Sequence, residues 1–86
     1  MKVAFRISVE GRVTGVGFRY HVLDAASRFP ELQGYVRNAS DREVEAVVQG
    51  EAGAVEEVLA AIRQGPPMSR IDGVSCVKIS VDETLE

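Results

Sequence analysis

The spacing of the hydrophobic residues changes at residues 11–19, and this change constrains the fold more than any other feature of the chain. Between residues 2 and 10 apolar and polar side chains alternate, and the apolar face consists of Val3, Phe5, Ile7 and Val9. Alternation with a period of two is typical of a half-buried strand. From residue 18 the spacing becomes helical, and one face is marked by Phe18, Val22, Ala25, Ala26 and Phe29. Because Pro30 is expected to stop this helix, the chain begins with a strand and a helix in direct succession.

The remaining residues predict two more strands, a second helix and a last strand. Segments 34–38 and 44–49 have strand-like composition, and residues 39–42 between them have the composition of a hairpin turn. A helical pattern covers residues 52–64, and Gly65-Pro66-Pro67 is expected to end it. Its inward face is predicted to hold Val55, Val58, Leu59 and Ile62. The segment 74–81 predicts the final strand, with an inward face of Val77, Ile79 and Val81.

The order strand, helix, strand, strand, helix, strand predicts an α+β fold. Each helix has one apolar stripe and each strand one apolar face, so two helices on one face of a four-stranded sheet would bury every stripe. Right-handed crossovers leave few topologies, and the ferredoxin-like split βαβ sandwich (βαββαβ), with a mainly antiparallel sheet, satisfies them best. A chain of 86 residues is too short for two cores, so residues 1–86 are expected to form a single domain.

The composition excludes several classes of function. Lys and Arg number 10 against 13 Asp and Glu, for a net charge of −3, which argues against a nucleic-acid partner because such binding relies on a basic surface. No apolar run approaches the roughly 18 residues of a membrane span, so no membrane partner is expected. The single cysteine, Cys76, excludes an internal disulfide and a thiolate zinc cluster. The N-terminal residues lack the apolar core of a signal peptide, and the expected location is cytoplasmic.

The connection between the first strand and the first helix has the composition of a phosphate-binding loop. Residues 11–19 read Gly-Arg-Val-Thr-Gly-Val-Gly-Phe-Arg. A glycine-rich turn that leads into a helix directs several free N–H groups at one point, which makes an anion site. Arg19 would add a planar charged group that matches phosphate oxygens. The alternative is a tight connection whose arginine is simply solvated, and glycine-rich turns alone do not separate the two.

Two known nucleotide-binding motifs do not fit these residues. A P-loop requires Gly-Lys-Ser/Thr after the second glycine, whereas Gly15 is followed by Val16 and Gly17. A dinucleotide-binding fold requires an acidic residue at the end of a second parallel strand about 20 residues on, but Asn38 and Asp41 fall at a predicted hairpin.

Three blocks of residues together resemble the acylphosphatase family. They are the glycine-rich run that ends in Gly15-Val16-Gly17-Phe18-Arg19, the block Gly34-Tyr35-Val36-Arg37-Asn38, and the later Asp41-x-x-Val44-Glu45 with Gln49-Gly50. Gly65-Pro66-Pro67, followed by Arg70 and Val74, is similar to the closing segment of that family. The resemblance extends from Val3 to Val81. It implies the same split βαβ sandwich and hydrolysis of a carboxyl-phosphate anhydride to a carboxylate and inorganic phosphate.

The resemblance also implies the site. The family's catalytic arginine and asparagine fall on Arg19 and Asn38, and the backbone that binds the substrate phosphate falls on Gly15, Val16, Gly17, Phe18 and Arg19. Arg19 and the loop N–H groups would neutralise the phosphate, and Asn38 would orient the attacking water without acting as a base. Neither a metal nor another cofactor is expected, the only partner expected is a small-molecule acyl phosphate, and the chain is expected to be a monomer.

Three departures from the family pattern bear on this site. Thr14 occupies the place of a usual glutamine, with little expected effect because the loop binds through its backbone. Arg42 replaces the glycine that usually follows the hairpin aspartate. The segment Phe29-Pro30-Glu31 replaces a helix-ending glycine and adds one residue between Arg19 and Asn38. This addition threatens the assignment most, because both residues must reach one phosphate.

Two other functions are compatible with parts of this sequence. A catalytically inactive, acylphosphatase-like module could bind an anion as an accessory domain, as in hydrogenase-maturation carbamoyltransferases. An RNA-binding sandwich would need exposed aromatic residues on its central strands, where the only aromatic residue is Phe5, on the apolar face.

His21 is expected to be a surface histidine and Cys76 a sheet residue. Arg12 and Arg37 are expected to be surface charges that could steer an anionic substrate.

Overall fold

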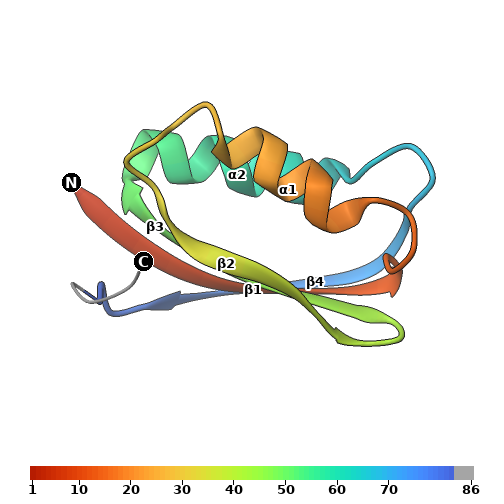
Figure 1. The fold of residues 1–86 in the computed structure, drawn as a ribbon. Helices are drawn as coiled ribbons and strands as arrows, with labels where there is room; N and C mark the ends of the chain where they lie inside the picture. Colours follow the sequence, from red (N-terminus) through yellow and green to blue (C-terminus); the bar gives the residue numbers. More distant parts are fainter. Residues whose placement is uncertain (83–86) are drawn as a thin grey trace.

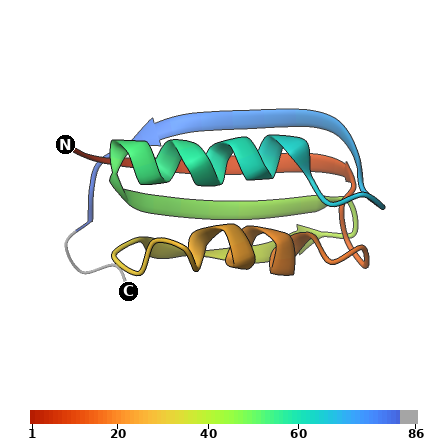
Figure 2. The ribbon, with the colours of Figure 1, turned by 90° about the horizontal axis from the view of Figure 1, so that it is seen from above.

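The computed structural model describes residues 1–82 and has the predicted order of elements (Figure 1). The elements are β1 (Lys2–Arg12), α1 (Phe18–Ala26), β2 (Gln33–Ser40), β3 (Glu43–Glu51), α2 (Ala52–Gln64) and β4 (Arg70–Ile79). The strands form one sheet in the order β2-β3-β1-β4, and every neighbouring pair is antiparallel. Both helices cover the same face of this sheet (Figures 1 and 2). The predicted ferredoxin-like α+β sandwich is therefore confirmed.

The core lies between the helices and the sheet. On β1, Val3, Ile7 and Val9 are buried, and Phe5 packs against them. The predicted inward residues of α2 (Val55, Val58, Leu59 and Ile62) are all buried in the same cluster. The predicted bounds of α2 are also confirmed, because Gly65 follows the last helical residue at a positive φ of 68°.

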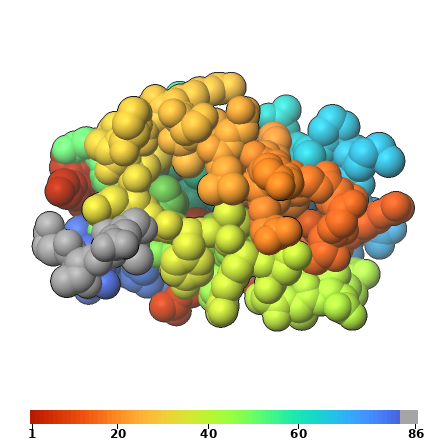
Figure 3. Space-filling model, viewed as in Figure 1, coloured from red at the N-terminus to blue at the C-terminus, as the bar shows by residue number. Residues whose placement is uncertain are grey.

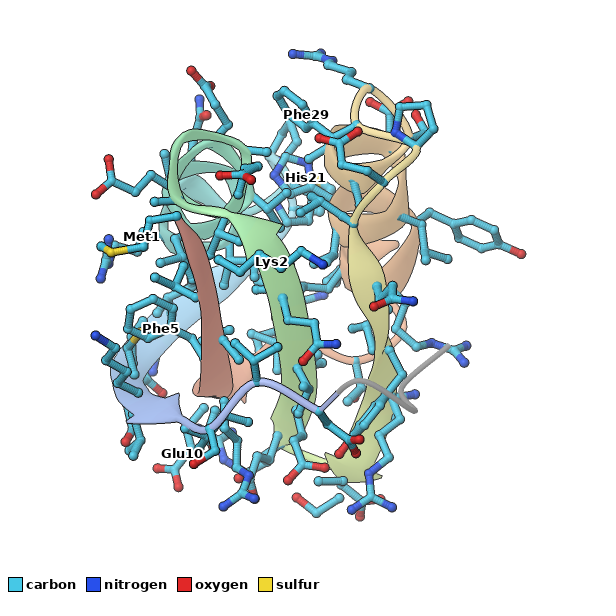
Figure 4. The ribbon with its side chains drawn as sticks, turned by 90° about the vertical axis from the view of Figure 1, so that its left-hand side faces the viewer. Met1, Lys2, Phe5, Glu10, His21 and Phe29 are labelled. Atoms are coloured by element: carbon cyan, nitrogen blue, oxygen red, sulfur yellow. The ribbon has the colours of Figure 1, made fainter. Side chains whose placement is uncertain are left out.

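The helix α1 is shorter than the sequence predicts. It ends at Ala26, and the N–H of Phe29 donates to the carbonyl of Ala26 in a turn. A proline disfavours helical backbone angles at the residue before it, so Pro30 keeps Phe29 out of the helix. Phe29 still packs against the core from this turn, on the side of the helices (Figure 4).

The strand β4 begins four residues earlier than the predicted Val74 and presents a different face to the core. Val77 pairs with Arg6 on the face without helices and is 51% exposed, so the prediction that it faces inward is wrong. Ile79 pairs with Ala4 on that same face, while Cys76 pairs with Ile7 and packs against the core. The register is continuous over these pairs and shifts only after Glu10, so the pairing of Cys76 with Ile7 decides which face of β4 is inward.

The hairpin between β2 and β3 is tighter than predicted. Ala39 and Ser40 belong to β2, so only Asp41 and Arg42 form the turn. The pairing shifts register between Asn38 and Ser40, which is the mark of a β-bulge. This irregularity lies directly after Asn38, at the end of the strand that carries it.

Candidate functional site

The loop between β1 and α1 has the backbone of an anion-binding turn. Gly15 and Gly17 adopt the left-handed conformation at φ 70° and φ 78°, and Gly17 is the N-cap of α1. Such angles disfavour residues with a side chain by about 1–2 kcal/mol. On either side of these glycines, Val13 and Phe18 are buried and anchor the loop to the core.

The N–H groups of this loop are free. Within residues 1–82, no backbone N–H from Gly15 to Tyr20 donates a hydrogen bond to the protein. Gly17 offers no side-chain cap, and the first turn of α1 carries no acidic residue. The positive end of the α1 dipole is therefore open to an anion from solution.

Arg19 lies in the first turn of α1 with its side chain exposed. It makes no ion pair or hydrogen bond with the described part of the chain. Its neighbour Phe18 is 2% exposed and fixes the start of the helix in the core. Arg19 therefore starts from the same turn as the free N–H groups, and its guanidinium has no partner among residues 1–82.

Asn38 lies at the end of β2 on the face that the helices cover. It pairs with Val44, and Val44 pairs with Val9, so Asn38 shares a row with two buried core residues. Its side chain is exposed and makes no hydrogen bond within residues 1–82. Because residues alternate along a strand, its neighbour Arg37 faces the opposite side of the sheet.

The fold brings Arg19 and Asn38 to the same end of the sheet. The loop 13–17 follows the last residues of β1, and these residues pair with the start of β3, next to the end of β2. Figure 3 shows the orange atoms of the loop and the start of α1 directly against the yellow-green atoms of the hairpin. The additional residue falls in the connection 27–32, which lies at the opposite end of α1 (Figure 2).

Other arginines lie on β1, β2, β4 and the hairpin. Arg37 pairs with Glu45 at 2.8 Å on the helix-free face, and Glu45 raises the pKa of Arg37 by its hydrogen bond and its charge. Arg37 therefore lies apart from the loop. Arg12 lines a hollow together with Arg42 and Arg70, next to Thr14. These last two arginines both pair with Asp72, whereas Arg12 forms no ion pair within residues 1–82.

His21 and Cys76 have structural environments. The Nε2 atom of His21 lies 2.8 Å from the carbonyl oxygen of Ala61, and the ring lies between α1 and α2 (Figure 4). His21 is half-buried rather than on the surface, and its ring also contacts the edge of Phe18. Cys76 is a half-buried residue of β4, as predicted. Residues 1–82 contain no group of three or more His, Cys, Asp or Glu side chains that could hold a metal.

Comparison with known proteins gives one family. The acylphosphatase family model matches residues 5–86. The curated acylphosphatase of Syntrophotalea carbinolica is 42% identical over 84 residues, which cover 98% of this chain and 90% of that protein. The curated acylphosphatase of Rhizorhabdus wittichii is 45% identical over 73 residues, which cover 85% of this chain and 73% of that protein.

Solved structures agree with the sequence matches. The crystal structure of acylphosphatase from Bacillus subtilis has a TM-score of 0.86 and 35% identity, and the match covers 96% of this chain and 91% of that one. The crystal structure of full-length HypF in its phosphate- and nucleotide-bound form also has a TM-score of 0.86, with 32% identity, but the match covers only 11% of that chain. In the described residues no helix is both long enough and apolar enough to span a membrane.

Proposed function

The chain belongs to the acylphosphatase family, and from this premise we propose that Arg19 binds the phosphate of an acyl phosphate while Asn38 positions the attacking water. The protein is a hydrolase of acyl phosphates. The observation that carries the proposed roles is the open anion site at the start of α1, with Asn38 on the helix-covered face at the same end of the sheet.

The first part of the mechanism is neutralisation of charge. An acyl phosphate carries nearly two negative charges on its phosphoryl oxygens, and phosphoryl transfer requires these oxygens to be held and their charge balanced. In this mechanism the N–H groups from Gly15 to Arg19, which have no acceptor within residues 1–82, donate to the oxygens. The Arg19 guanidinium adds two parallel donors and a permanent charge. The backbone donors are fixed by the fold before the substrate binds, so little reorganisation of the loop opposes the transition state.

The second part is placement of water. The carbonyl oxygen of the Asn38 side chain can accept a hydrogen bond from one water while its NH2 group donates elsewhere, so Asn38 orients the water without removing a proton. The water oxygen forms a bond to phosphorus as the bond from phosphorus to the acyl oxygen breaks. The leaving group departs as a carboxylate, and a phosphate oxygen of the substrate takes the proton of the water. The products are a carboxylate and inorganic phosphate.

This chemistry needs no strong acid, base or metal. A carboxylate is a good leaving group because its conjugate acid has a pKa of about 4. The positive charge that a metal would supply comes from Arg19 and the helix N-terminus. Chelation with EDTA is therefore expected to leave the rate unchanged.

A second candidate function is binding of an anion without turnover. It is favoured by the HypF structure, in which the matching part is a small portion of a much longer chain. An accessory module of this kind would bind phosphate through the same loop but would release none from an acyl phosphate.

The test is release of phosphate from benzoyl phosphate in the presence of EDTA. The wild type is expected to turn over, Asn38→Ala to lose turnover while phosphate still inhibits by binding, and Arg19→Gln to lose both. Arg28→Gln is the matched control, because Arg28 is an exposed arginine just beyond the far end of α1 with no ion pair in the described chain. Normal kcat in Asn38→Ala would overturn the role of that residue.

The remaining expectations concern the context of the enzyme. We infer a single domain over residues 1–86, a monomer, and a cytoplasmic location in which the half-buried thiol of Cys76 stays reduced. Sedimentation equilibrium of the purified chain tests the monomeric state.

A further inference from the structure

The side chain of Thr14 forms a hydrogen bond to a residue that is distant in the sequence. Its hydroxyl donates to the carbonyl oxygen of Asp41 at 2.6 Å. Thr14 precedes Gly15 in the anion-binding loop, and Asp41 is the first residue of the turn that follows β2. The bond therefore joins the segment that holds the phosphate to the hairpin that carries Asn38.

This connection matters because the sheet does not supply one directly. β3 lies between β1 and β2, so the two strands are separated by two strand spacings, or about 9.5 Å. The last pair of the β1–β3 ladder is Glu10 with Glu43, and the loop 13–17 lies beyond it. No ladder hydrogen bond therefore fixes the loop relative to the end of β2.

The hairpin is otherwise fixed from its other side. The Arg42 carbonyl accepts from the N–H of Gly11 at 2.9 Å, and the Arg42 guanidinium pairs with Asp72. The N–H of Arg42 donates to the hydroxyl of Ser40. The contacts with Gly11 and Asp72 hold the turn to β1 and β4, whereas among the described residues the Thr14 hydroxyl alone forms a hydrogen bond from residues 13–17 to the hairpin.

We propose that Thr14 is a positioning residue for the hydrolysis: its bond to Asp41 sets the distance between the phosphate held at Arg19 and the water held at Asn38. This inference rests on the proposed function. Arg19 and the loop N–H groups follow Thr14 in one continuous segment, so they keep their mutual geometry when the bond is lost. What changes is their place relative to Asn38. A displacement of about 1 Å between reacting groups can cost about a hundredfold in rate.

The experiment compares Thr14→Val, which keeps the shape but removes the hydroxyl, with Thr14→Ser, which keeps the hydroxyl. For Thr14→Val we expect kcat for benzoyl phosphate to fall about tenfold, while the inhibition constant of inorganic phosphate stays within about twofold of the wild type. Thr14→Ser is expected to restore kcat to within about threefold. The matched control is Ser27→Ala, which removes another exposed hydroxyl that donates to a carbonyl at 2.6 Å, far from the loop.

Three results would overturn the inference. One is wild-type kcat in Thr14→Val. The second is an equal loss of kcat in Thr14→Val and Thr14→Ser, and the third is a rise in the phosphate inhibition constant as large as the fall in kcat. Either of the last two would make the effect a general disturbance of the loop. The proposed function fails separately: it fails if the wild type releases no phosphate, or if Asn38→Ala retains normal kcat.

Discussion

Replacing Gly17 by alanine separates backbone strain from steric space at the start of α1. An alanine Cβ at Gly17 would meet nothing within 4 Å, so the substitution creates no clash. Its cost comes from φ 78°, where a residue with a side chain is disfavoured by about 1–2 kcal/mol. Alanine also lowers the conformational entropy of the unfolded chain, which stabilises the folded state by about 0.4–1 kcal/mol. The net expectation is a destabilisation of about 1 kcal/mol.

The second residue of α2, Gly53, provides the matched control. A Cβ there also meets nothing within 4 Å, but its φ lies outside the left-handed region. Gly53→Ala therefore keeps the gain from the unfolded chain without the strain and should stabilise the protein by about 0.4–1 kcal/mol. The two variants should differ by about 1–2 kcal/mol, which is the strain at Gly17 alone.

Urea denaturation followed by circular dichroism measures the free energy of unfolding of both variants. A shift in the midpoint at constant slope reports a change in that free energy. For a domain of this size each kcal/mol corresponds to about 4–8 °C in Tm. Equal free energies of unfolding in the two variants would refute the reasoning. A backbone that escapes the strain at residue 17 would also redirect the N–H groups of Phe18 and Arg19, so Gly17→Ala should bind phosphate more weakly than Gly53→Ala.

Three further predictions follow from other features. Phe18→Ala should destabilise the protein by about 3–5 kcal/mol because the ring is buried, whereas Tyr20→Ala, at a 76% exposed position, should stay within about 0.5 kcal/mol in the same urea assay. A hydrogen bond from the amino group of Met1, and the positive charge of that group, lower the pKa of Glu51. The ion pair should therefore stabilise the protein above the ordinary carboxyl pKa, and this stabilisation should be lost as the pH falls through the lowered pKa. The difference in urea midpoint between wild type and Glu51→Gln should be small near pH 7 and vanish in strong acid; a difference that grows on acidification would contradict this sign. Arg19→Lys keeps the charge but loses the paired donors, so the phosphate inhibition constant should rise, though less than in Arg19→Gln; equal constants in Arg19→Lys and wild type would argue against paired donation.

The fold was largely predictable because most elements follow one simple period. The bounds and inward face of α2 were correct, since its apolar stripe is continuous and Gly65 marks its end. The face of β4 was not predictable from its own residues, because Val77 and Cys76 are both apolar and adjacent. Only the pairing with β1 decides that Cys76 faces the core.

Candidate site residues can be named from the sequence, but the contacts around them cannot. The alternation of β2 could already have separated Arg37 from Asn38, because neighbouring strand residues face opposite sides. The role of Thr14 had no signal in the sequence, because its partner is a backbone carbonyl distant in the chain. That Arg19 and Asn38 act on one phosphate stays a prediction, supported by their position at one end of the sheet.

A crystal structure with inorganic phosphate tests this prediction most directly. The account predicts that the phosphate oxygens lie within hydrogen-bond distance of the Arg19 guanidinium and of the N–H groups from Gly15 to Arg19, with one ordered water shared between the phosphate and the Asn38 amide. Phosphate bound in the hollow of Arg12, Arg42 and Arg70 instead, or bound at Arg19 but beyond the reach of a water on Asn38, would contradict it.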